Sequence, residues 1–135
     1  MSGISGGVER MIVDTDVLIW VLRGSRKAAR TVDRAEGRAV SIINYMELIQ
    51  GARDKRELKS IKDFLADLQF KLLPLTENIG HRAAIYVEEY GLSSSMGMAD
   101  ALIAATAVEN HEPLLSANRR HYRPIKDLEL KLFRP

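Results

Sequence analysis

Three carboxylates stand in stretches that otherwise read as buried core. Asp14 lies in IVDTDV, Glu47 in IINYMELIQ and Asp100 in MADALIAATAV. Burying an ionised carboxylate without a partner is costly, so each must find hydrogen-bond donors, take up a proton or bind a cation. Because the chain has no cysteine, a metal would need oxygen or imidazole ligands. Gathered carboxylates favour one or two Mg²⁺ or Mn²⁺ ions, which activate water and neutralise a phosphoryl group.

Each acid also has a purely structural interpretation. Asp14 or Asp16 could cap a helix that begins near residue 17, and Asp16 is the favoured candidate. Asn44 and Glu47 have the spacing of a capping box. Asp100 could be a first-turn acid that the dipole of its helix favours. Taken one at a time, these acids do not decide between structure and catalysis.

The elements that would position these acids alternate between short apolar strands and longer helices. This alternation predicts a parallel sheet covered on both faces, with strands at 11–13, 39–43, 70–75 and 114–116 and a possible edge strand within 128–132,. Ligands of open α/β sheets bind at the carboxyl ends of strands, where the strand order reverses. Asp14 ends the first strand and Asn118 follows the fourth. We therefore expect Asp14, Glu47, Asp100 and Asn118 to converge there.

Length and composition indicate one domain over residues 11–135. Residues 1–10, MSGISGGVER, are predicted to be a disordered extension or a remnant of cloning,. No apolar run reaches the ~20 residues that cross a bilayer, and the N-terminus lacks the apolar core of a signal peptide. We therefore expect a cytoplasmic protein with no membrane partner. The net charge of +2 permits a polyanionic partner without requiring one,.

Four blocks of this sequence, taken together, closely resemble one family. IVDTDVLIWVLRG, INYMELIQGA, MADALIAATAV and LLSANRRHYRPI, in that order, resemble the PIN-domain ribonucleases, and specifically the VapC-type toxins of toxin–antitoxin pairs. The resemblance runs from residue 11 to about residue 132. It implies a three-layer α/β/α fold with a central parallel sheet of four to five strands. It also implies Mg²⁺- or Mn²⁺-dependent hydrolysis of RNA phosphodiester bonds by metal-activated water.

The resemblance assigns roles to individual positions. Asp14, Glu47 and Asp100 match the acids that hold the metal, and Thr15 matches the hydroxyl residue beside the first acid. Many family members carry aspartate where this chain has Asn118. The neutral amide implies one well-occupied ion and a second that phosphate oxygens complete. Asp16 is interpreted as a helix cap or an outer-shell group.

Cationic residues follow the first and the fourth strand and would flank the acids. We expect Arg23, Arg119 and Arg120 to contact the RNA backbone, with Thr15 and Ser116 as further substrate-binding residues,. An ordinary solvated surface is the alternative. His121, among these arginines, is expected to contact phosphate or to face solvent.

The resemblance further implies two protein partners. One is a cognate VapB-like antitoxin whose C-terminal segment lies over the active site. The other is a second copy of the chain, for which apolar residues around 45–49 and 64–68 are candidate contacts,.

Two other functions fit parts of the sequence. A non-catalytic RNA-binding module with the PIN fold would explain the neutral Asn118. A haloacid-dehalogenase-like aspartyl phosphatase would explain the DxD pattern of IVDTDV, although the chain is short and no acidic pair follows the fourth strand.

Overall fold

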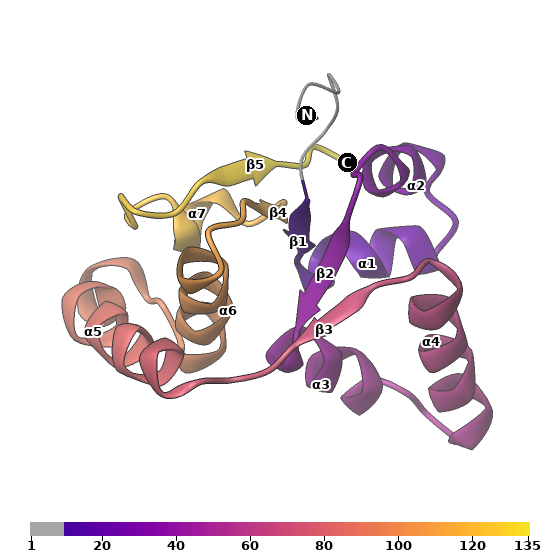
Figure 1. Cartoon of the computed structure of the whole chain (residues 1–135), viewed down its shortest axis with the longest axis horizontal. Coiled ribbons are helices and arrows are strands. Elements are labelled where there is room, and N and C mark those ends of the chain that lie inside the picture. The colour runs from indigo at the N-terminus through magenta and orange to yellow at the C-terminus, as the bar shows by residue number, and fades with distance from the viewer. Residues whose placement is uncertain (1–9) are drawn as a thin grey trace.

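Five parallel strands form a single central sheet in the computed structural model, which describes residues 10–135 (Figure 1). The strand order is β3-β2-β1-β4-β5. Nearly all of the predicted N-terminal extension lies outside the described residues. The strands are β1 (Met11–Val13), β2 (Arg38–Ser41), β3 (Lys71–Leu73), β4 (Leu114–Ser116) and β5 (Leu130–Leu132). The predicted α/β/α fold is confirmed, and the possible edge strand is β5.

The helices cover both faces of the sheet (Figure 1). They are α1 (Thr15–Leu22), α2 (Arg26–Asp33), α3 (Ile42–Gln50), α4 (Lys55–Asp67), α5 (Glu77–Ser94), α6 (Met98–Glu109) and α7 (Arg119–Tyr122). No helix in the described part of the chain is long and apolar enough to cross a membrane.

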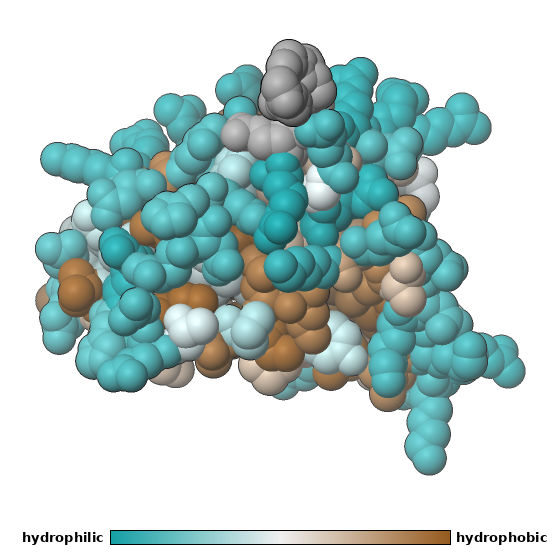
Figure 2. Space-filling model, viewed as in Figure 1, coloured by the Kyte–Doolittle hydropathy of each residue, from teal (hydrophilic) through white to brown (hydrophobic). Residues whose placement is uncertain are grey.

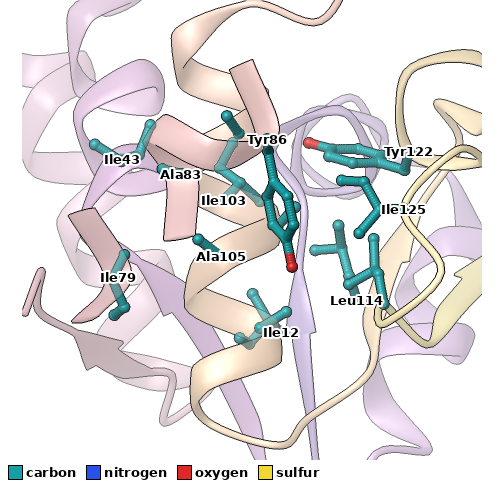
Figure 3. Close-up of a cluster of buried hydrophobic side chains, with 14 of the residues drawn as sticks. Ile12, Ile43, Ile79, Ala83, Tyr86, Ile103, Ala105, Leu114, Tyr122 and Ile125 are labelled. Atoms are coloured by element: carbon teal, nitrogen blue, oxygen red, sulfur yellow. The ribbon is translucent and has the colours of Figure 1, made fainter. Parts of the chain in front are cut away.

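Alternation along the strands divides the core into two layers. Met11 and Val13 pack on the face covered by α1, α2 and α4. Ile12 and Leu114 pack on the opposite face, under Tyr86 of α5 and Ile103 of α6 (Figure 3). The central strands are therefore apolar on both sides, as the nearly unbroken apolar runs of the sequence predict.

The strand order reverses between β1 and β4. From β1 the chain proceeds through β2 to β3 on one side, and β4 then pairs with the other side of β1. The carboxyl ends of β1 and β4 therefore flank the point where open α/β sheets bind ligands. Asp14 follows β1 directly, and its backbone N–H donates to Leu115 O at 2.9 Å.

The starts of α1 and α3 differ from those expected. Asp14, not Asp16, is the N-cap of α1. Helix α3 begins earlier, with Ser41 as N-cap and Asn44 in its capping box, so Glu47 takes no part in that box. Helix α5 continues through Gly91 to Ser94, and its C-cap residue Ser95 has a φ of 56°. One helical glycine costs only about 1 kcal/mol, and the buried Met96 just beyond the helix packs into the core.

The expected self-association segments contribute largely to the core. Leu48 and Leu65 are buried, whereas Met46 is 45% exposed. Further apolar exposure surrounds β3, where Leu72 and Leu75 are 44% and 47% exposed. Figure 2 shows apolar side chains gathered in the lower middle of the face that β3 crosses.

Candidate active site at the carboxyl edge of the sheet

Asp14 is a buried carboxylate whose hydrogen-bond donors, among the described residues, are all uncharged. Its Oδ1 accepts from Thr15 N at 2.9 Å and from Asn44 Nδ2 at 3.0 Å, and its Oδ2 accepts from Ser116 Oγ at 2.7 Å. Burial raises the pKa of Asp14, and the hydrogen bonds only partly oppose that rise,. The ionised form of this carboxyl is therefore under-stabilised and would gain from a nearby cation.

Asn44 connects Asp14 to the start of α3, a role that the sequence analysis missed. Its side chain is fully buried. The amide Nδ2 donates to Asp14 Oδ1 and, at 2.9 Å, to Thr15 Oγ1. The amide Oδ1 accepts from Ser41 N at 3.2 Å and from Ser41 Oγ at 2.8 Å. The available signal was the capping-box spacing from Ser41 to Asn44, directly after a buried strand.

Glu47 lies one helical turn after Asn44 and reaches the same network. Its Oε1 accepts from Thr15 Oγ1 at 2.6 Å, and the residue is exposed. The Thr15 hydroxyl, expected to bind substrate, thus joins Glu47 to the amide that also holds Asp14. The structure brings Glu47 to the carboxyl edge, with Thr15 between it and Asp14.

Asp100 meets Asp14 at the hydroxyl of Tyr122. Tyr122 is 1% exposed, and its OH donates to Asp100 Oδ1 at 3.4 Å. Burial raises the pKa of Tyr122 far above its ordinary value, and the charges of Asp14 and then Asp100 raise it further. The phenol therefore stays protonated as a donor between the two acids. No sequence signal beyond an apolar position marked Tyr122.

Asn118 and His121 form a short cap beside Asp100. Asn118 is the N-cap of α7, where its Oδ1 accepts from His121 N at 3.3 Å. The Nδ1 atom of His121 lies 2.8 Å from Asp100 Oδ2 and 3.0 Å from Asn118 Nδ2. Its side chain is 30% exposed. The expectation that His121 faces solvent or a phosphate missed this contact with Asp100.

Asp16 belongs to the same edge and does not cap α1. Its Oδ2 accepts from Ala117 N at 3.1 Å, and Ser116 Oγ lies 3.5 Å from the same oxygen. The other oxygen, Oδ1, is buried and has no hydrogen-bond partner among the described residues. Burial and then the charge of Asp14 raise the pKa of Asp16 to about 6.

The predicted substrate-binding residues fall in different places. Ser116 is fully buried, and its hydroxyl accepts from Asn118 N at 2.9 Å while donating to Asp14. Arg119 and Arg120 are exposed in the first turn of α7, the helix whose His121 contacts Asp100. Arg23 is the C-cap of α1, about 14 Å along the helix axis from Asp14. The structure therefore brings Arg119 and Arg120, but not Arg23, to the acidic edge.

The acids lie at the same edge of the sheet but do not form a complete metal-binding site. Among residues 10–135, no three Asp, Glu or His side chains are close enough to hold a metal as they stand. Asp14 and Asp16 nevertheless lie against the same Ser116 hydroxyl, at 2.7 and 3.5 Å, and Asp100 accepts from the Tyr122 hydroxyl.

A pocket of about 600 Å³ lies elsewhere, between α5 and residues 125–127. Its central cation, Arg82, is already paired with Glu109 at 2.5 Å and with Asp127 at 3.3 Å. That arrangement offers little uncompensated charge, so the carboxyl edge is the stronger candidate site.

Known proteins are similar to this chain over most of its length. A family model described as "PIN domain" matches residues 11–126. Ribonuclease VapC1 of Methanocaldococcus jannaschii is 27% identical over 128 residues, which cover 92% of this chain and 87% of the relative. Ribonuclease VapC19 of Mycobacterium tuberculosis is 32% identical over 124 residues, covering 87% and 96%.

Solved structures share the fold. One is the crystal structure of VapBC2 from Rickettsia felis bound to a DNA fragment from their promoter. It matches with a TM-score of 0.77 at 18% identity, and the match covers 93% of this chain and 99% of the solved chain.

Proposed function

The chain belongs to the PIN-domain family, and we propose that it is a metal-dependent endoribonuclease, the toxin of a VapBC-type toxin–antitoxin pair. The observation that carries the proposal is the meeting of Asp14 and Asp100 at the Tyr122 hydroxyl, with Glu47 joined to the same network through Thr15. Relatives that cover most of this chain are named ribonucleases.

The residues at the carboxyl edge fit a divalent cation. The available donors are carboxylate oxygens, which Mg²⁺ and Mn²⁺ prefer. The buried Oδ1 of Asp16 lacks a partner among the described residues, and burial disfavours the charged form of Asp14. Asp14, Glu47 and Asp100 would hold the ion, after side-chain adjustment of the two outer acids. When bound, it would lower the pKa of a water molecule and offset charge on the phosphodiester.

The protein's own groups orient the substrate around that position. Neutral donors fix Asp14 without cancelling its charge. Arg119 and Arg120, exposed at the first turn of α7, supply cations for backbone phosphates on either side of the scissile bond. Aromatic residues make up only 6% of the chain, so stacking on bases contributes little and the proposed contacts are mainly to the RNA backbone.

The direct test is RNA cleavage by purified protein in Mn²⁺ or Mg²⁺, with and without EDTA. The expected result is endonucleolytic cutting of structured RNA that EDTA stops and that Asp14→Asn and Asp100→Asn abolish. Asp67→Asn, an exposed acid on α4, is the matched control and should cut as the wild type does. Equal cutting by all four proteins would mean a contaminating nuclease and would overturn the proposal.

A VapB-like antitoxin is the proposed regulatory partner. The support is that solved proteins sharing the fold include VapBC complexes. Co-expression with the neighbouring reading frame should yield a stable complex that suppresses cleavage. Homodimerisation remains a prediction, which light scattering of the purified chain would test.

The non-catalytic alternative predicts RNA binding without cleavage, and the same assay separates it. The aspartyl phosphatase alternative is not favoured, because the chain belongs to the PIN-domain family. After β4, moreover, no acidic residue occurs before Asp127.

A further inference from the structure

The geometry points to Asp16 as a further carboxylate of the divalent-cation site, supplying the negative charge that the neutral Asn118 cannot. This inference rests on the proposed function and deepens it. Asp16 is not the helix cap that its place in the sequence predicts, because Asp14 occupies that position.

Asn118 already has a structural role as the N-cap of α7. Its Oδ1 accepts from His121 N as the N-cap of α7, and its Nδ2 faces the imidazole of His121. Using Asn118 as a metal ligand would leave the start of α7 uncapped. Even then it would contribute a neutral oxygen, which binds a divalent cation more weakly than a carboxylate does.

Asp16 is hydrogen-bonded next to Asn118, the position at which many family members carry aspartate. Its Oδ2 accepts from the backbone N–H of Ala117, the residue directly before Asn118. The Ser116 hydroxyl lies 2.7 Å from Asp14 Oδ2 and 3.5 Å from Asp16 Oδ2. Two carboxylates therefore share one hydroxyl, which brings like charges together and favours a cation between or beside them.

The second oxygen of Asp16 is the independent observation. Oδ1 is buried and has no hydrogen-bond partner in the described part of the chain. Buried acceptors are nearly always satisfied, so this carboxylate oxygen can take a cation or an ordered water molecule as its partner. The dipole of α1 explains an acid in its first turn. It does not explain why one oxygen of that acid is buried without a donor.

The test is Mn²⁺ binding measured by isothermal titration calorimetry, independently of cleavage. Asp16→Asn should weaken Mn²⁺ affinity by at least about tenfold, whereas the control Asp67→Asn should leave it unchanged. The double variant Asp16→Asn/Asn118→Asp should recover part of the lost affinity, because aspartate also caps helices well. Urea unfolding in EDTA verifies that each variant is folded.

The outcomes separate this inference from the proposed function. If Asp16→Asn binds Mn²⁺ as the wild type does while Asp14→Asn does not, Asp16 is no ligand and the nuclease proposal stands. If the double variant binds no better than Asp16→Asn, the loss reflects disturbed packing and the inference is overturned. If the wild type binds no Mn²⁺ at all, both proposals fail.

Discussion

Ser116 and Asp14 are 102 residues apart and are joined by a hydrogen bond of 2.7 Å that links the ends of β4 and β1. The donors to Asp14 include the Ser116 hydroxyl, the Asn44 amide and the Thr15 backbone N–H, and like the nearby Tyr122 hydroxyl all are uncharged. These donors orient the carboxylate without cancelling its charge, which leaves it able to attract a cation. An arginine at the same place would have neutralised it.

Replacing Ser116 by alanine should destabilise the metal-free protein by about 1–3 kcal/mol at pH 7, because the buried Asp14 loses a donor. Urea unfolding in EDTA measures this change. Mn²⁺ affinity should also fall, since Asp14 is no longer held toward β4. Ser60→Ala, exposed on α4, is the control. A Ser116→Ala protein with unchanged stability and affinity would show that the bond does not orient Asp14.

Asn44→Asp should strongly destabilise the metal-free protein at pH 7. The new carboxylate would replace an amide that donates to Asp14 Oδ1 at 3.0 Å, so a hydrogen bond becomes a repulsion between buried charges. Lowering the pH toward 5 should recover part of the loss, because one of the two acids can then take up a proton. Thermal unfolding in EDTA across this range checks both effects. An equal loss at both pH values would attribute the cost to packing alone.

The metal-free protein should gain stability as the pH falls from about 7 to about 5. Burial raises the pKa of Asp14 and raises that of Asp16 to about 6, so between the unfolded and folded values the folded state binds more protons. Stability therefore falls as pH rises through this window. Asp16→Asn should reduce the change in unfolding free energy across this pH window by an amount on the order of 1 kcal/mol, after allowance for the partial exposure of Asp16.

Denaturant unfolding in EDTA at several pH values provides that comparison, and parallel curves for the wild type and Asp16→Asn would contradict it. Saturating Mn²⁺ should remove the pH effect at neutral pH by stabilising the ionised acids. Unfolding measured with Mn²⁺ also distinguishes carboxylates that bind the cation from acids that are only buried.

Local sequence was enough to single out the candidate acids. Asp14, Glu47 and Asp100 are marked by apolar neighbours on both sides, and alternating strands and helices place the first acid at the carboxyl edge of a parallel sheet. The local sequence predicted the helix boundaries less accurately. Helix α5 runs past Gly91 because tertiary packing can outweigh the small local cost of a glycine.

The groups that the sequence analysis missed depend on register between distant segments. The Ser116 and Tyr122 hydroxyls reach Asp14 only because β4 pairs with β1. Asp16 looked like an ordinary cap, since nothing local shows that Asp14 takes the cap itself. Arg23 looked adjacent to the acids because it follows the first strand closely in sequence, but α1 carries it away from the carboxyl edge.

That difference between the arginines gives a last prediction. Arg119→Ala/Arg120→Ala should weaken RNA binding and reduce the slope of log K against log salt by roughly 0.7 for each single-strand phosphate that the protein no longer neutralises. Arg23→Ala should change neither quantity, since Arg23 caps the far end of α1. Fluorescence anisotropy with labelled RNA, using the Asp14→Asn protein to prevent cleavage, measures the slope at several salt concentrations. Mn²⁺ affinity should stay unchanged in both arginine variants, because neither touches the acids. If Arg23→Ala lowers the slope as much as the double variant does, RNA lies along α1 instead of across α7, and the proposed path of the backbone is wrong.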